Sequence, residues 1–195
     1  MSSRNHRAAR IHVWRVVVSA LLIVAAAATG CATTPQDSQP VHTAQDFCTP
    51  FLDYFRTDFP IDRVELDYQG GTGKPDQPLD RAITCRFIPS SDPQVSATVT
   101  LRPTKADEDE NGLATYVEHN GLVPLPGHEK EIWIDDARVK NGQFQTKGVV
   151  ELATRVDPWV SGMTITDAEG SLEITDEQIG EAADLLITTT EAMIQ

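Results

Sequence analysis

The chain has 195 residues and a formal net charge of −13, because its 29 acidic residues outnumber its 16 basic ones. An anionic surface of this kind repels phosphate backbones, so nucleic acid is not expected as a partner. Once the N-terminal segments described next are set apart, roughly 150 residues remain, which suffices for one hydrophobic core but hardly for two. We therefore expect a single folded domain.

The N-terminal segment has the layout of an export signal. Residues 1–15 contain four arginines and no acid, and residues 16–28 are almost entirely aliphatic. This apolar run of about 13 residues is shorter than the roughly 20 that a membrane-spanning helix needs. It is typical of the apolar region of a signal peptide, and the small residues that follow it suit a peptidase site.

The residues Ala28-Thr29-Gly30-Cys31 resemble the lipobox of bacterial lipoproteins, although Leu is more usual at the position of Ala28. The resemblance implies cleavage before Cys31 and a diacylglycerol on its thiol. Two acyl chains meet the requirement for stable attachment to a membrane. The chain is then expected on the extracytoplasmic face of the cell membrane. The alternatives are an ordinary cleaved signal with a chance cysteine, or an uncleaved anchor.

This interpretation divides the chain into three parts: a signal peptide over 1–30, a lipidated N-terminus and tether over 31–44, and a domain over 45–195. The tether is rich in Thr, Pro, Gln and Ser and has no apolar run. Cleavage removes four arginines and no acid, so the formal charge falls from −13 to −17. Any membrane attachment must therefore come from the acyl chains and not from a basic patch.

The two other cysteines, Cys48 and Cys85, form an even pair in an exported protein. A disulfide between them is the expectation in an oxidising compartment. A zinc or redox pair is the alternative, but the sequence has neither a CxxC spacing nor histidines close to these residues.

The first expected elements of the domain are a helix and a strand. Thr49-Pro50 fits an N-cap followed by proline at the first helical position, and Pro60 would end this short helix. Apolar residues alternate with acids over 64–68, which is the period of a strand with one buried face. Three glycines and two prolines over 70–78 predict a loop.

Two hairpins are expected next. Strands over 83–87 and 95–101 would form the first and place Cys85 inside. Asn141-Gly142 suits a type I′ turn between strands over 132–139 and 144–156, and a further strand follows over 159–166.

Thr175 and Gln178 fit a capping box at the start of a C-terminal helix. The expected fold is α+β, with an antiparallel sheet of about five to six strands and a helix near each end of the domain.

One acidic segment resembles the calcium loop of an EF-hand. Asp107, Asp109, Asn111, Gly112 and Glu118 satisfy the pattern D-x-[DN]-x-[DN]-G-x5-E. The resemblance implies side-chain oxygens at the first, third, fifth and twelfth positions, the backbone carbonyl of Leu113 at the seventh and Thr115 at the ninth. The segment before it reads as a strand, whereas the family has a helix there. The alternative is an acidic turn that caps a short helix near 110–119.

No motif indicates catalysis. The run 70–75 resembles a phosphate-binding loop, but Tyr68 stands where the first glycine is needed and Pro75 where a hydroxyl residue is needed. The sequence has no GxSxG motif, and only His42, His119 and His128 remain after cleavage. We expect a protein that is not an enzyme and has no cofactor, apart from possible calcium.

The layout is similar to that of small tethered lipoproteins of actinobacterial envelopes, which implies a carrier, sensor or assembly role. We expect a non-catalytic binding or accessory domain whose partner is an envelope protein or a small apolar ligand. A carrier of an apolar ligand or lipid and a calcium-binding module are the alternatives, and an extracytoplasmic hydrolase is the least favoured one.

Overall fold

The computed structural model describes residues 41–59, 63–90, 95–104, 110–138, 148–167 and 174–195. All described residues belong to one compact unit, Gln39–Gln195. The signal peptide and Cys31 therefore lie outside the described residues.

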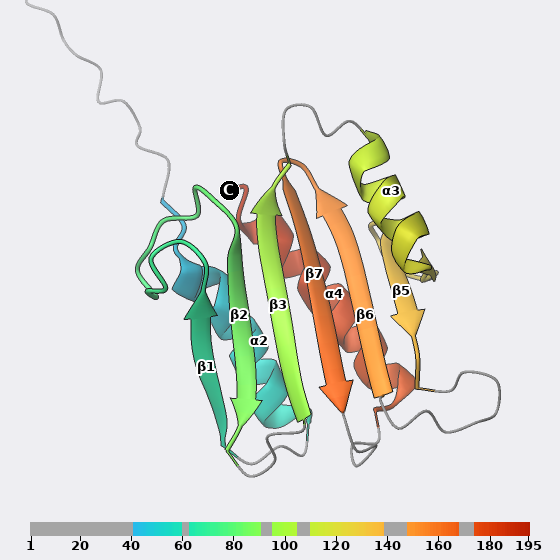
Figure 1. The fold of residues 1–195 in the computed structure, drawn as a ribbon, viewed down its shortest axis with the longest axis horizontal. Coiled ribbons are helices and arrows are strands. Elements are labelled where there is room, and N and C mark those ends of the chain that lie inside the picture. The colour runs from blue at the N-terminus through green and yellow to red at the C-terminus, as the bar shows by residue number, and fades with distance from the viewer. Residues whose placement is uncertain (1–40, 60–62, 91–94, 105–109, 139–147, 168–173) are drawn as a thin grey trace, which may run out of the picture. The chain divides into compact units, whose positions relative to one another are not determined.

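The described strands form one antiparallel sheet with the order β1-β2-β3-β7-β6-β5-β4 (Figure 1). Its strands are β1 (Val64–Gln69), β2 (Ile83–Pro89), β3 (Val95–Pro103), β4 (Val123–Pro124), β5 (Ile132–Asp136), β6 (Gly148–Val156) and β7 (Trp159–Asp167). Two meanders, β1 to β3 and β4 to β7, join where β3 pairs with β7. The expected α+β class is confirmed, with seven strands in place of five to six because the two-residue β4 is too short to leave a sequence pattern.

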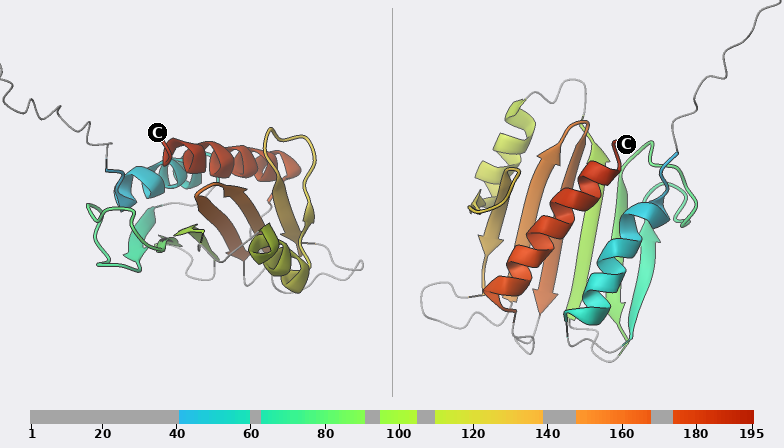
Figure 2. Two further views of the ribbon diagram at one scale, coloured as in Figure 1. Left: turned by 90° about the horizontal axis from the view of Figure 1, so that it is seen from above. Right: turned by 180° about the vertical axis from the view of Figure 1, so that it is seen from behind.

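Three helices flank this sheet. Helices α2 (Ala44–Thr57) and α4 (Asp176–Ala192) cover one face, and α3 (Glu110–Asn120) lies on the other (Figure 2). The main core fills the space between the sheet and helices α2 and α4. Its largest fully buried side chains include Phe47, Phe51, Phe55, Phe87, Leu101, Leu152, Met163, Ile165 and Leu186. A smaller cluster under α3 contains Leu113, Leu122, Ala153 and Val160.

Helix α2 begins at Ala44, so the predicted start at Thr49-Pro50 is wrong. Thr43 is the N-cap: its Oγ1 accepts from the Asp46 amide at 3.3 Å, and its own amide donates to Asp46 Oδ2 at 2.8 Å. Pro50 lies inside the helix, where it removes one backbone hydrogen bond. The earlier start buries Phe47 and Cys48 completely against the sheet, which offsets that loss.

The capping box predicted for the last helix is confirmed. The Thr175 amide donates to Gln178 Oε1 at 2.9 Å, and the Gln178 amide donates to Thr175 Oγ1 at 3.2 Å. The Tyr54 hydroxyl on α2 donates to the Gln178 carbonyl at 2.7 Å. This contact fixes the two helices side by side over the core.

The predicted disulfide between Cys48 and Cys85 is also confirmed. Cys48 lies on α2 and Cys85 on β2; their Cα atoms are 5.8 Å apart, and the two residues are 37 positions apart in the sequence. Both side chains are fully buried. The bond therefore links the first helix covalently to the face of the sheet on which it packs.

Candidate functional site

The segment predicted to bind calcium is only partly described. Asp107 and Asp109 lie outside the described residues, and the side chain of Asn111 is not described either. Leu113, Thr115 and Glu118 lie on helix α3, with Leu113 buried and the other two exposed.

A calcium loop needs the carbonyl of Leu113 to turn toward the ion, whereas a carbonyl inside a helix points along the helix axis. Calcium binding would therefore require this helical segment to change conformation. Within the described ranges, no group of three or more His, Cys, Asp or Glu side chains is placed to hold a metal ion. Calcium binding remains a prediction for this segment.

The glycine-rich loop over 70–81 packs on the start of helix α2. The Ala44 amide donates to the Gln77 carbonyl at 2.9 Å, and the Gln45 amide donates to the Pro75 carbonyl at 2.8 Å. The Gln77 side chain is buried and its Oε1 accepts from the Thr72 hydroxyl at 2.8 Å. The loop thus satisfies two amides at the start of α2 that could otherwise bind an anion. Its glycines are explained without a ligand, because Gly70, Gly71 and Gly73 all have positive φ.

The face of the sheet opposite α2 and α4 is covered by α3 over β5 and β6, and within the described residues it is open over β1, β2 and β3 (Figure 1). Hydroxyl and charged side chains alternate outward along these strands. Thr84 is the register partner of Thr100, and Thr98 is that of Thr164. One row of register partners crosses the sheet through Asp67, Arg86, Thr98, Thr164, Glu151 and Asp135. We call the outward residues of β1, β2 and β3 the open face; the same row continues onto β6 and β5, which α3 covers.

Helix α3 is held at the border of the open face by a polar contact. The Tyr116 hydroxyl donates to Glu151 on β6. Burial and this hydrogen bond raise the pKa of Tyr116 to about 12, so the tyrosine stays protonated at neutral pH. Tyr116 as a whole is still 41% exposed and lies beside the open face.

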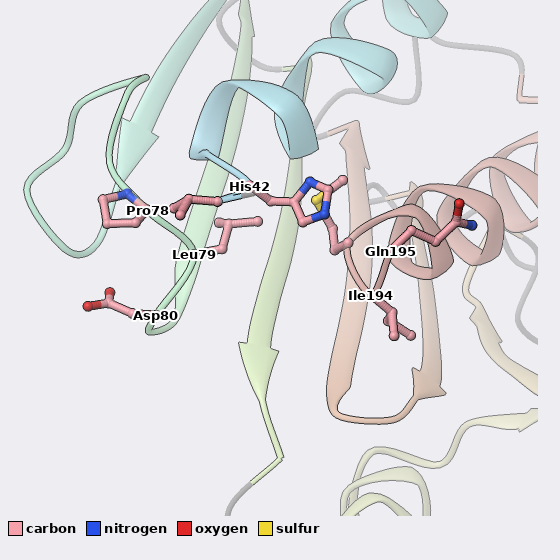
Figure 3. A pocket seen from close by; sticks show the side chains of 8 residues that line it. His42, Pro78, Leu79, Asp80, Ile194 and Gln195 are labelled. Atoms are coloured by element: carbon pink, nitrogen blue, oxygen red, sulfur yellow. The ribbon is translucent and has the colours of Figure 1, made fainter. Parts of the chain in front are cut away.

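A second surface feature is a groove of about 250 Å³ at the end of the domain where the described chain begins (Figure 3). We call it the tether groove. It is lined by Val41, His42, Pro78, Leu79, Asp80, Met193, Ile194 and Gln195. The bridge between Thr43 and Pro78 and the hydrogen bond from the Leu79 amide to the His42 carbonyl, 3.0 Å long, hold two of its three segments together.

His42 gives the tether groove an unusual polar atom. Its Nε2 is buried and has no hydrogen-bond partner among the described residues. A buried polar atom without a partner costs about 1–3 kcal/mol, and such atoms are few in folded proteins. Figure 3 shows the His42 ring between Leu79 and the end of the chain at Ile194 and Gln195. The atom has almost no accessible surface in this structure, so a group that enters the groove could supply the missing partner only after neighbouring side chains move aside.

The two other histidines lie elsewhere. His128 Nδ1 is 2.6 Å from Asp184 Oδ1, which ties the β4–β5 loop to helix α4, and His119 is exposed on α3. No serine, threonine or cysteine side chain hydrogen-bonds to any of the three histidines in the described part of the chain. A separate hollow of about 260 Å³ beside His128 is built from one continuous segment, residues 124–133.

Comparisons with known proteins add no relative. No protein family, curated protein or solved structure matched the chain. Among the described residues, none of the helices is both long and apolar enough to cross a membrane.

Sequence reasoning did not predict the tether groove. Residues 41–42, 78–80 and 193–195 are far apart in the chain, and no spacing relates them. The alternation of apolar and polar residues in the strands does indicate which residues form the open face, because every second residue of a strand points to the same side. The sequence did not indicate, however, which strands α3 would cover and which would stay open.

Proposed function

We propose that this chain is a lipid-anchored, exported lipoprotein of the cell envelope and that its α+β domain is a non-catalytic binding or accessory module. The observation that carries the proposal is the Cys48–Cys85 disulfide. Buried structural disulfides persist in oxidising compartments outside the cytoplasm, which is where a lipobox would deliver the chain.

The open face supports a binding role. It presents hydroxyl, carboxylate and guanidinium groups on a rigid sheet, with the exposed Tyr116 at its border. Polar groups fixed on strands are suited to recognising a partner because little conformational entropy is lost when they bind.

The packing of the core favours surface binding over the carriage of an enclosed apolar ligand. The apolar gap lined by Phe55, Phe87 and Ile165, among others, holds only about 10 Å³. Pockets for small ligands usually measure about 300–1,000 Å³. An apolar ligand inside this part of the core would have to displace packed side chains.

The anchor is tested by Cys31→Ala. The variant should lose metabolic labelling with a fatty acid and leave the membrane fraction, because the acylated thiol is gone. Cys85→Val is the matched control, since it removes a different cysteine and should keep both the label and the membrane location. If Cys31→Ala still takes up label and sediments with membranes, the lipobox interpretation is wrong.

The open face is tested by photo-crosslinking in intact cells. A benzophenone amino acid in place of Thr98 should give a discrete crosslinked adduct, because that position points outward from the open face. The same amino acid in place of Asp53, which is exposed on α2, is the control. Adducts that form equally at both positions, or only at Asp53, would contradict a binding role for the open face.

A further inference from the structure

We propose that the tether groove is a membrane-contact site that takes the headgroup and ester region of a phospholipid. The domain would then rest on the bilayer by this end. This inference depends on the lipid anchor at Cys31 proposed above, and it adds an orientation and a contact that the anchor alone does not imply.

The position of the groove is the first argument. Val41 lines the groove and is ten residues from Cys31 in the sequence. Ten residues span at most about 35 Å when fully extended, so an anchored chain keeps the groove close to the bilayer at all times. A tethered surface of this kind meets its target at a high effective concentration, so that even a weak contact is populated.

The chemistry of the rim is the second argument. Only four large apolar side chains are strongly exposed in the described part of the domain, and two of them, Val41 and Ile194, lie in the tether groove. Val41 is 71% exposed and Ile194 is 41% exposed. Leu79 and Met193 extend this apolar surface into the groove. Such a surface is suited to the boundary between headgroups and acyl chains, where exposed apolar groups leave water.

The buried His42 Nε2 is the third argument. It lacks a partner among the described residues and belongs to a residue that lines the groove. An imidazole nitrogen can donate a hydrogen bond to a phosphate oxygen or to an ester carbonyl oxygen. Both acceptors occur in the region of a phospholipid that would face the apolar rim, so one ligand can satisfy both features of the groove.

The charges of the groove and of the whole chain determine which lipids the groove should bind. Asp80 lines the groove, and the neighbouring Arg81 is paired with it, with Arg81 Nε 3.0 Å from Asp80 Oδ1. The predicted mature chain carries −17, so long-range attraction to anionic lipids is absent. The contact should therefore depend on apolar burial and on His42, should not require anionic lipid and should be insensitive to salt.

The experiment uses the full lipidated chain in phosphatidylcholine vesicles whose acyl chains carry bromine, a quencher of tryptophan emission. Val41→Trp places a fluorophore in the groove. Val123→Trp is the matched control, because Val123 is 58% exposed but lies on β4, at the edge of the sheet opposite β1. Trp133 and Trp159 contribute the same background to both variants. We expect at least twofold stronger quenching of the tryptophan at position 41 than of that at 123.

Two further variants on the Val41→Trp background locate the contact. Ile194→Asp should reduce the quenching at least twofold, whereas Thr188→Asp, on the exposed side of α4, should leave it unchanged. His42→Phe keeps a ring and removes both nitrogens, and it should also reduce the quenching. No reduction in His42→Phe would overturn the role of His42, and no reduction in Ile194→Asp would overturn the groove as the contact.

The outcomes separate this inference from the anchor. If the chain floats with the vesicles but quenching is equal at positions 41 and 123, the membrane-contact site is wrong and the anchor stands. If the chain does not float with the vesicles, the anchor fails and the inference fails with it. Quenching that appears only with anionic lipid and disappears in high salt would also overturn the proposed chemistry.

Discussion

At the scale of single residues, one arginine joins two elements that are distant in the sequence. Arg138, just after β5, donates to Asp136 Oδ2 at 2.7 Å and to Asp176 Oδ1 at 2.6 Å, and it also donates to the Ile174 carbonyl. The hydrogen bond from Arg138 lowers the pKa of Asp136. A carboxyl with a lowered folded-state pKa stabilises the fold at neutral pH, and this contribution is lost as the pH falls through that pKa.

Arg138→Ala should lower the free energy of unfolding at pH 7 by about 1–2 kcal/mol, because it removes charged hydrogen bonds at the start of α4. Urea denaturation measures the change. The difference from the unmutated protein should shrink as the pH falls below about 4, where Asp136 begins to be protonated in the unfolded state, and should be lost once the pH falls through the lowered pKa of Asp136 in the folded state. Arg81→Ala is the control, since Arg81 and its partner Asp80 are exposed, and it should have no measurable effect. Equal losses in the two variants would argue against a special role for Arg138.

At the scale of elements, replacing glycine by alanine should have opposite effects on stability at two positions, Gly71 and Gly180. Gly71 has a φ of +56°, and a Cβ added there would lie 2.5 Å from Gln77 Oε1. Gly71→Ala should therefore destabilise the loop on α2 by roughly 1–2 kcal/mol. Gly180 lies inside α4 with nothing within 4 Å of an added Cβ, so Gly180→Ala should stabilise the domain by about 0.5–1 kcal/mol. Thermal unfolding of both variants checks the two signs, and the same sign in both would contradict this account.

Elements with a strong local pattern could be predicted from the sequence. The alternation of apolar residues predicts β1, β2 and β3, and the Thr175–Gln178 capping box predicts the start of α4. Helix α2 begins earlier than the sequence predicts. Thr49-Pro50 is locally a good helix start, but the burial of Phe47 that favours the earlier start depends on strands that follow α2 in the sequence. The tether groove depends on three distant segments, so only the tertiary structure brings its residues together.

At the scale of the whole molecule, the two surfaces proposed to act lie on different sides. The tether groove is at one end of the strands, near the start of α2 and the end of α4, and the open face runs along the strands (Figures 1 and 2). With the groove on the bilayer, the strands would extend away from the membrane. The open face would then stay accessible to a partner in the envelope while the domain is held in one orientation.

The stability of the whole domain should depend on the Cys48–Cys85 bond, because it closes a loop of 37 positions in the unfolded chain. The chain-entropy estimate for such a loop is about 4 kcal/mol. The double variant Cys48→Ala, Cys85→Val removes the bond and keeps apolar side chains at these two buried sites. Because the loss of the covalent link is then the main change, the melting temperature should fall by roughly 8–16 °C.

Calorimetry of the purified chain measures this change, and mass analysis without reductant should find the unmutated chain two hydrogens lighter than its dithiol form. Cys31→Ala is the control, since it removes a cysteine outside the domain and should leave the melting temperature unchanged. If the double variant melts within a degree or two of the unmutated chain, the packing of α2 on the sheet holds without the covalent link, and the disulfide has no part in the stability of the fold.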